Sequence, residues 1–299
     1  MVVRERADPY ASRFDVPVSG GAVRVVRAGP RVEDAETVVL AIHGVTASLM
    51  TWRSLARELD DGVCMLAPDL RGRGQSSKLP GPYGIEQHIA DLMAILDYAG
   101  APPVVLVGHS MGAYIAERLA ADHPERATAV VMLDAGLPFP LPEDPREMLD
   151  GAIASTVMRL AITFPSAELY VLGWRAHPAF AHAWNDDVEA YARYDVTEGG
   201  TVARCNASPE AVRTDTAEMV LDDRTRLALE RVRAPVQLLR AERGLFDEDP
   251  LISAEELQAF AETHPSVHVE EVADVNHYTL VMGAGPGPRR VAAAIERAR

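Results

Sequence analysis

Residues 108–112 read Gly-His-Ser-Met-Gly and are the clearest candidate for chemistry in the chain. The four apolar residues 104–107 predict a buried strand before them, and residues 113–122 predict a helix that stops before Pro124. A serine between strand and helix occupies a strained turn, and small glycine neighbours leave room for its close approach. We therefore predict that Ser110 is a nucleophile, with a helix N-terminus beneath it that favours developing negative charge.

A serine hydroxyl is a weak nucleophile and needs a base within hydrogen-bond reach. The chain has nine histidines, and His277 follows the last predicted strand, 267–272. From that position a side chain can reach back over the sheet towards the serine. We predict that His277 is the base, whereas His43, which precedes a glycine at a strand end, braces its own loop.

The elements that must position these residues alternate between strand and helix, which predicts a mostly parallel, doubly wound sheet. Residues 14–28 predict an antiparallel hairpin at its edge, around Ser19-Gly20-Gly21. Buried strands are predicted at 37–42, 63–67, 104–107, 129–133, 235–241 and 267–272. Asp134 then falls, like Ser110, at the carboxyl end of a strand, where such sheets carry their chemistry.

The alternation breaks between residues 137 and 231, where proline-rich turns and amphipathic helices replace buried strands. We interpret this segment as a helical cap inserted into a core formed by residues 1–136 and 232–299. A cap over strand ends makes the apolar cleft that ligands use. We expect its aromatic residues and the neighbour of His277 to bind substrate: Trp174, His177, Trp184 and Tyr278.

Four motifs in this order, His43-Gly44, the loop 68–76, residues 108–112 and residues 274–277, resemble those of serine hydrolases with the α/β-hydrolase fold. The resemblance runs from residue 14 to the end of the chain but says little about residues 137–231. It implies that the backbone N–H groups of Val45 and Met111 form the oxyanion hole. The loop residues Asp69, Arg71 and Arg73 are expected to hold that loop beside the oxyanion turn.

The acid that should orient His277 is left open by the sequence. The family usually places it after the strand 235–241, at a position that is Gly244 in this chain and cannot serve. Asp247 lies three residues later, and Glu242 is a third possibility. We favour Asp134, because haloalkane dehalogenases and zearalenone lactonase resemble this arrangement with their acid at the corresponding strand end.

The resemblance implies an esterase or lipase that cleaves carboxylic esters, or lactones, of apolar small molecules through an acyl-enzyme. Epoxide hydrolases and haloalkane dehalogenases share the fold but carry an aspartate where Ser110 stands. One alternative is C–C bond hydrolysis of a dienoic ketone, in which Arg159, Arg175 and His177 would bind a second carboxylate. Another is a non-catalytic ligand receptor of the same fold.

Composition excludes several other classes. A net charge of −15 argues against nucleic-acid binding, and no stretch reaches the ~20 apolar residues of a membrane span. The N-terminus lacks the apolar region of a secretory signal, and Cys64 and Cys205 form no disulfide framework, so we expect a cytoplasmic protein. Neither metal-ligand spacing nor a dinucleotide fingerprint is present, so no cofactor is expected. The oligomeric state is open.

Overall fold

The protein is built around one eight-stranded sheet, seen in a computed structural model that describes residues 7–138, 141, 144–199 and 201–299. The strand order is β1-β2-β4-β3-β5-β6-β9-β10. β1 pairs antiparallel with β2 and β2 with β4, whereas all the other neighbours are parallel. The strands are Tyr10–Val18, Gly21–Ala28, Thr37–Ile42 (β3), Val63–Pro68 (β4), Val104–His109 (β5), Ala127–Leu133 (β6), Val236–Arg243 (β9) and His268–Asn276 (β10).

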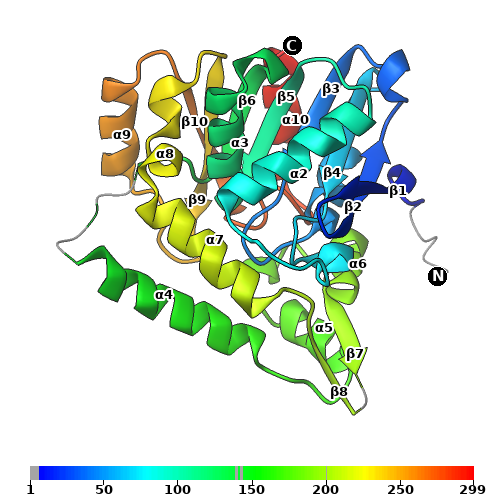
Figure 1. The fold of residues 1–299 in the computed structure, drawn as a ribbon. Coiled ribbons are helices and arrows are strands. Elements are labelled where there is room, and N and C mark those ends of the chain that lie inside the picture. The colour runs from blue at the N-terminus through cyan, green and yellow to red at the C-terminus, as the bar shows by residue number, and fades with distance from the viewer. Residues whose placement is uncertain (1–6, 139–140, 142–143, 200) are drawn as a thin grey trace.

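Helices cover both faces of this sheet, which confirms the predicted doubly wound architecture. Figure 1 shows α2 (Ile85–Tyr98) and α3 (Met111–Asp122) in front of the sheet and α10 (Gly287–Arg297) behind it. Alternate residues of β3 enter two different cores: Val38, Leu40 and Ile42 pack towards α2 and α3, and Val39 and Ala41 towards α10. Burial on both faces explains why the parallel strands read as continuous apolar runs.

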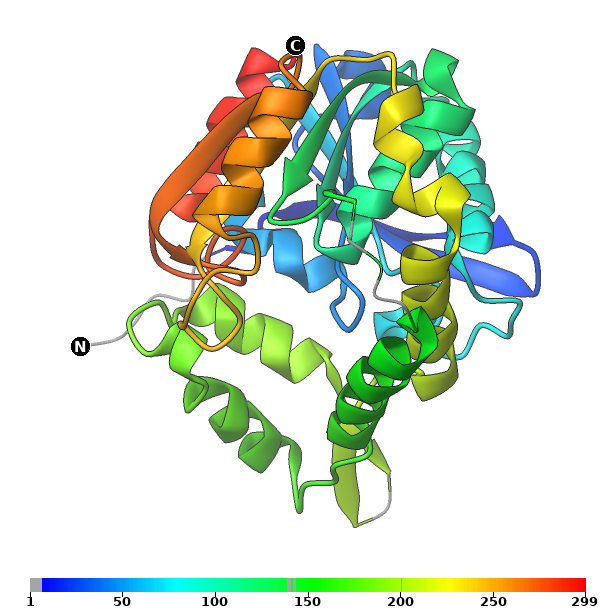
Figure 2. The ribbon, with the colours of Figure 1, turned by 90° about the vertical axis from the view of Figure 1, so that its left-hand side faces the viewer.

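The chain between β6 and β9 lies across the end of the sheet where the parallel strands terminate (Figures 1 and 2). It forms α4 (Pro145–Leu160), α5 (Ala167–Arg175), α6 (Asp186–Tyr194), α7 (Pro209–Leu221) and α8 (Asp223–Arg226). A two-stranded hairpin of β7 (Val196–Gly199) and β8 (Val202–Cys205) was not expected from the sequence. Its strands are short and largely exposed, so they lack the apolar pattern that predicts a buried strand.

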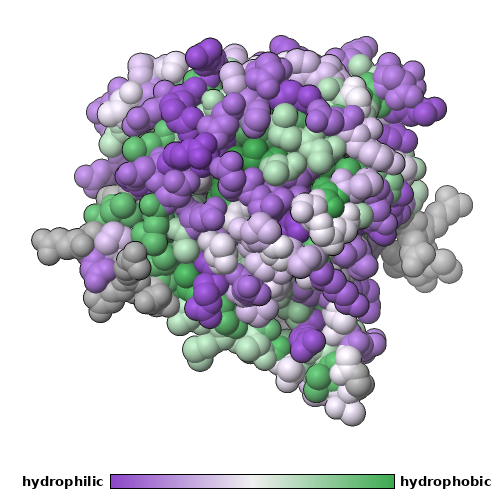
Figure 3. Space-filling model, viewed as in Figure 1, coloured by the Kyte–Doolittle hydropathy of each residue, from purple (hydrophilic) through white to green (hydrophobic). Residues whose placement is uncertain are grey.

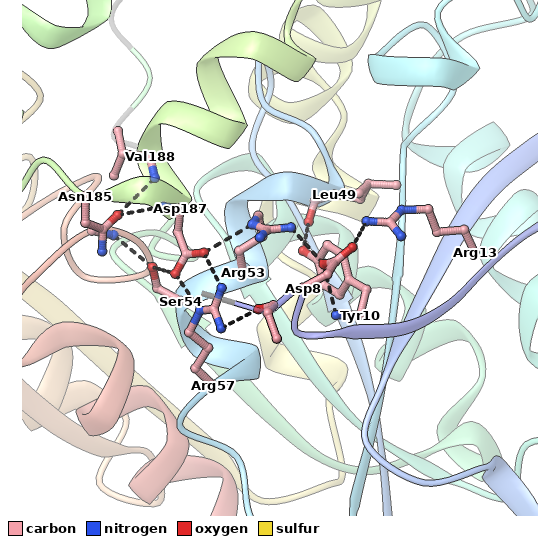
Figure 4. A network of polar contacts seen from close by, with 12 residues as sticks. Asp8, Tyr10, Arg13, Leu49, Arg53, Ser54, Arg57, Asn185, Asp187 and Val188 are labelled. Atoms are coloured by element: carbon pink, nitrogen blue, oxygen red, sulfur yellow. Dashed lines mark hydrogen bonds and ion pairs between the residues drawn. The ribbon is translucent and has the colours of Figure 1, made fainter. Parts of the chain in front are cut away.

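A network of ion pairs fastens α6 to α1 (Arg53–Ala56), as Figure 4 shows. The carboxylate of Asp187 accepts hydrogen bonds from Arg57 at 2.9 and 3.0 Å and from Arg53 at 3.2 Å. Arg53 also bonds Asp8 at 2.8 Å, so the network reaches the N-terminal part of the chain. Asp187 is buried, and burial alone would raise its pKa, but the two arginines lower it.

A second ion pair fastens α7 to the loop after β4. The buried carboxylate of Asp215 pairs with Arg73, accepts the Gly84 N–H at 2.7 Å and lies 2.9 Å from His88 Nε2. Burial alone would raise the pKa of Asp215, but His88 and Arg73 lower it to about 2. The segment between β6 and β9 is thus tied to the core at both α6 and α7.

The predicted edge hairpin is confirmed, although β1 begins at Tyr10, four residues earlier than expected. The short helix α1 covers four residues after a 3₁₀ turn at Leu49–Trp52. The visible face in Figure 3 is mostly hydrophilic, with apolar residues gathered over α4 and α7. None of the described helices is long and apolar enough to cross a bilayer.

Candidate active site

Ser110 stands at a sharp turn between β5 and α3. Its φ of 56° and ψ of −125° lie in a region that non-glycine residues rarely occupy. A Cβ on Gly108 would lie 2.1 Å from the Gly112 carbonyl oxygen, and one on Gly112 would lie 2.0 Å from that of Ile42. The two glycines are therefore required sterically, and they let the turn hold Ser110 at the end of the sheet.

The Gly44–Val45 peptide lies beside this turn in a fixed orientation. Leu70 N–H donates to His43 Nε2 at 3.0 Å, so the His43 Nδ1–H donates to the Gly44 carbonyl at 2.8 Å. Burial lowers the pKa of His43 to about 3, which keeps the ring neutral. Because the N–H of a trans peptide points opposite to its C=O, His43 fixes the direction of the Val45 N–H.

The N–H groups of Val45 and Met111 have no acceptor among the described residues. A Cβ on Gly44 would lie 3.1 Å from Ser110 Cβ, so the peptide passes directly against the serine. Arg73 Nε donates to the Val45 carbonyl at 2.9 Å and holds the other side of the residue. Two free donors thus lie next to Ser110, as an oxyanion site requires.

His277 lies in the loop after β10 and is oriented by Asp134. Its Nδ1 atom is 2.7 Å from Asp134 Oδ2, and both side chains are buried. The other carboxylate oxygen of Asp134 accepts the Ala241 N–H at 2.9 Å. Nδ1–H donates to the carboxylate, which leaves Nε2 of His277 as the proton acceptor.

His109, the residue before Ser110, supports the loop that carries His277. Its Nε2–H donates to the His277 carbonyl at 2.9 Å, and the two ring centroids are 4.4 Å apart. Burial, with the neighbouring His277, lowers the pKa of His109 well below its usual value, so this ring is neutral. The sequence showed His109 inside the Gly-x-Ser-x-Gly motif but gave no sign of this contact.

The two other acids that the sequence left open lie elsewhere. Asp247 accepts from Arg243 at 2.7 Å and from Asn276 at 2.9 Å. Glu242 accepts the Asp274 N–H at 2.8 Å. The structure therefore brings Asp134, and neither of these two, into hydrogen-bond contact with His277.

The side chains of the loop after β4 bind several other elements. Asp69 accepts from the N–H groups of Leu49 and Gln75, each at 2.8 Å, and from the Tyr194 hydroxyl at 2.6 Å. Arg71 pairs with Asp91, and Arg73 pairs with Asp215. These partners come from α2 and α7, distant in sequence, which is why the loop sequence alone could not identify them.

Two cavities meet at Ser110. One of about 170 Å³ is lined by Ser110, His277, Val45 and Tyr278. The other, of about 530 Å³, contains Ser110 and Met111 and is mostly apolar, with walls from Tyr114, Leu137, Met219, Leu251 and Phe260. Small-molecule sites are typically apolar clefts with a few polar groups, and this pair of cavities matches that description.

The four residues expected to bind substrate are divided among different places. Tyr278 lines the cavity of about 170 Å³, and Trp174 and His177 line a separate one of about 230 Å³. Trp184 lines none of these three cavities and packs edge-on against Phe180, with Arg175 over its ring.

No group of three or more metal-ligating side chains occurs within the part of the chain that the structure describes.

Curated relatives match only part of their own length. The chain is 40% identical over 117 residues to lipase LipV of Mycobacterium tuberculosis, which is 39% of this chain and 44% of that protein. It is 38% identical over 121 residues to epoxide hydrolase A of the same organism, covering 40% of this chain and 37% of that protein. This chain thus spans less than half the length of these relatives.

Solved structures resemble the whole chain more closely in shape than in sequence. E-2-(acetamidomethylene)succinate hydrolase has a TM-score of 0.76 at 22% identity, with 96% of this chain and 98% of that chain covered. The thioesterase domain from the curacin biosynthetic pathway has a TM-score of 0.74 at 19% identity, covering 95% and 98%. At such identities the likeness establishes the fold alone. The family model described as alpha/beta hydrolase fold matches residues 37–284, and the chain belongs to this family.

Proposed function

We propose that this hydrolase cleaves carboxylic esters of small molecules through a Ser110–His277–Asp134 triad and an acyl-enzyme. The observation that carries the proposal is the Asp134 carboxylate 2.7 Å from Nδ1 of His277, with His277 and Ser110 on one cavity. The three residues keep the usual chain order of the fold, serine, acid and histidine, but the acid follows β6 rather than β9.

The reaction would run in two halves. His277 Nε2 takes the Ser110 proton while Oγ attacks the ester carbonyl, and the Val45 and Met111 N–H groups bind the oxyanion. His277 then gives that proton to the leaving alcohol as the C–O bond breaks. Water, deprotonated by the same histidine, attacks the acyl-enzyme and releases the acid and free Ser110. A lactone would follow the same steps, with the alcohol still attached to the acyl group.

The segment 137–231 is proposed to act as the cap of this site. It contributes Leu137 and Met219 to the apolar cavity at Ser110, which favours apolar groups in the substrate. Relatives named as epoxide hydrolases do not change the proposal, because enzymes of that kind resemble this fold with an aspartate in place of Ser110. The dienoic ketone hydrolase and the receptor remain the competing functions.

A fluorophosphonate probe and a panel of p-nitrophenyl esters and lactones test the proposal. We expect the probe to label the protein at Ser110 and the panel to include hydrolysed esters. Ser110→Ala should lose both, whereas Ser12→Ala, on the edge strand β1, should keep both. Absence of any covalent adduct at Ser110 would favour the receptor, and turnover of a dienoic ketone without ester turnover would favour C–C hydrolysis.

A further inference from the structure

A cationic side chain reaches the cavity that contains Ser110 and His277. Arg159 lies in the last turn of α4 and lines this cavity of about 170 Å³. It also lines the cavity of about 230 Å³, and Thr46 is likewise common to both. Arg159 therefore lies where the two cavities share lining residues, and Ser110 lines one of them.

Arg159 has no ion-pair partner among the carboxylates that the structure describes, and its side chain is exposed. The charge of Arg159 nevertheless affects the pKa of Tyr278, which lines the cavity at Ser110. Burial raises the pKa of Tyr278, and the charge of Arg159, together with a side-chain hydrogen bond, opposes that rise.

Two acids face the same region without pairing with Arg159. Asp195 is buried and accepts hydrogen bonds from Tyr170 and Cys205, and burial raises its pKa to about 7. Glu248 acts on the pKa of Tyr278 from the loop after β9. Because the charges of two acids and one cation act on this region, it suits a monoanion better than a doubly charged phosphate.

The cavity at Ser110 also contains a buried hydroxyl without a partner. Thr51 is fully buried, its Oγ1 has no hydrogen-bond partner, and it lines the same cavity as Arg159. Buried polar groups are normally hydrogen-bonded, so this hydroxyl is left to bond a water molecule or a ligand group in the cavity. A carboxylate accepts only, and can take hydrogen bonds from both this hydroxyl and a guanidinium.

We propose that Arg159 binds a carboxylate of the substrate, so that the natural substrate is an ester that also carries a free carboxylic acid. This inference rests on the proposed ester hydrolysis. The planar guanidinium matches a carboxylate with two parallel hydrogen bonds. A net charge of −15 repels anions in general, so a chain of this composition needs a local cation to hold one.

Ser110 then lies between two different subsites. The cavity of about 170 Å³ with Arg159 takes the carboxylate and a few carbons, and the apolar cavity of about 530 Å³ takes the remaining group. The scissile bond of the substrate spans the two. An ester of a short dicarboxylic acid with an apolar alcohol has this distribution of charge.

A matched pair of esters measures the effect of the carboxylate. Mono-p-nitrophenyl glutarate and p-nitrophenyl valerate differ by a carboxylate in place of a methyl group. We expect a higher kcat/KM for the glutarate ester. Arg159→Met should lower the ratio of the two kcat/KM values by roughly tenfold to a hundredfold, the usual range for a hydrogen bond to a charged group. Arg159→Lys should retain part of the preference.

Arg175→Met is the control, because Arg175 belongs to the same segment but lies over Trp184 and lines neither cavity. In the Arg175→Met enzyme, the ratio of the kcat/KM values for the glutarate and valerate esters should match that of the unmodified enzyme. A wild-type enzyme without preference for the acid, or an Arg159→Met ratio equal to that of wild type, would overturn the proposal. Hydrolysis of the valerate ester in that case would leave the proposed ester hydrolysis standing.

A binding measurement separates the carboxylate site from catalysis. Calorimetric titration of Ser110→Ala protein with glutarate should show binding that inorganic phosphate does not match, and adding Arg159→Met should weaken it at least tenfold. Glutarate binding unaffected by Arg159→Met contradicts the subsite even if the esters are not hydrolysed at all. Conversely, Arg159-dependent glutarate binding in a protein that fluorophosphonate never labels would disprove only the catalytic proposal.

Discussion

The carboxylate of Asp134 and the imidazole of His277 lie 2.7 Å apart although 143 residues separate them in the chain. β6 and β9 are adjacent and parallel, and β10 follows β9, so the loops after these strands open at the same edge of the sheet. Asp134 directly follows β6 and has a φ of 52°, and its second oxygen accepts the Ala241 N–H of β9. The backbone of the neighbouring strand thus orients the acid that orients the histidine.

Asp134→Asn is therefore expected to lower kcat by about 10³- to 10⁴-fold with little change in KM. An asparagine has only one acceptor oxygen, so it cannot accept from both the Ala241 N–H and the His277 Nδ1–H. With its NH2 group facing Nδ1 it favours the wrong tautomer of His277. Asp247→Asn is the matched control, since Asp247 contacts Arg243 and Asn276 instead. Steady-state ester hydrolysis by both variants decides the assignment, and an inactive Asp247→Asn enzyme beside an active Asp134→Asn one would reverse it.

The sheet and the position of Ser110 could be predicted because both depend on local pattern. Runs such as residues 104–107 are apolar throughout, and the glycines around Ser110 fill a turn that admits no Cβ. The choice of acid could not be made in the same way. Asp134 and Asp247 each follow a strand, and only the side-chain direction, fixed by contacts across strands, distinguishes them.

Residues that act through long-range partners were also beyond the reach of the sequence. Arg73 was expected to hold its loop beside the oxyanion turn, and it does donate to the Val45 carbonyl, but the sequence gave no sign of its ion pair with Asp215, 142 residues away. Trp184 was expected to bind substrate because aromatic residues gather in its segment, yet it packs against Phe180. Helical periodicity predicts which face of a helix is buried. It does not predict which residues of that face line a cavity and which pack in the core.

His43→Gln is expected to lower kcat by about 10²- to 10³-fold, the usual effect of losing one oxyanion donor. The glutamine cannot both accept from Leu70 and donate to the Gly44 carbonyl with the geometry of the ring, so the Val45 N–H loses its fixed direction. A lower kcat with an unchanged KM identifies this positioning role. His268→Gln, on the exposed side of β10, should leave kcat unchanged.

Thermal unfolding of His43→Gln must be measured alongside its kinetics, because His43 is fully buried. A folded variant with normal kcat and normal KM would show that the Gly44–Val45 peptide holds its direction without His43. The same result would remove the physical reason for assigning an oxyanion role to the Val45 N–H.

Asp187→Asn is expected to lower the free energy of unfolding by about 1–3 kcal/mol, because it leaves Arg53 and Arg57 without their shared carboxylate. Urea denaturation at neutral pH measures this loss. Asp186→Asn is the control one residue away: Asp186 is exposed, and its removal should change the stability by less than about 0.5 kcal/mol. Equal effects from both variants would mean that the network in Figure 4 does not fasten α6.

Asp195→Asn should flatten the dependence of stability on pH. Burial raises the pKa of Asp195 to about 7 from its usual 3.8, so between these values the carboxyl is neutral when folded and ionised when unfolded. Its contribution to stability is fully present below pH 3.8 and is lost as the pH rises through about 7. The asparagine stays neutral throughout, and its carbonyl can still accept from Tyr170.

Urea denaturation at pH 5 and pH 8 gives the comparison for this last change. Between the two, the wild-type protein should lose stability relative to Asp195→Asn, by at most about 1.4 kcal/mol for each pH unit below 7. Asp223→Asn, an exposed acid of α8, should follow the wild-type curve. A constant difference between wild type and Asp195→Asn from pH 5 to pH 8 would contradict this prediction and show that Asp195 is already ionised in the folded state at pH 5, held by the charge of Arg159.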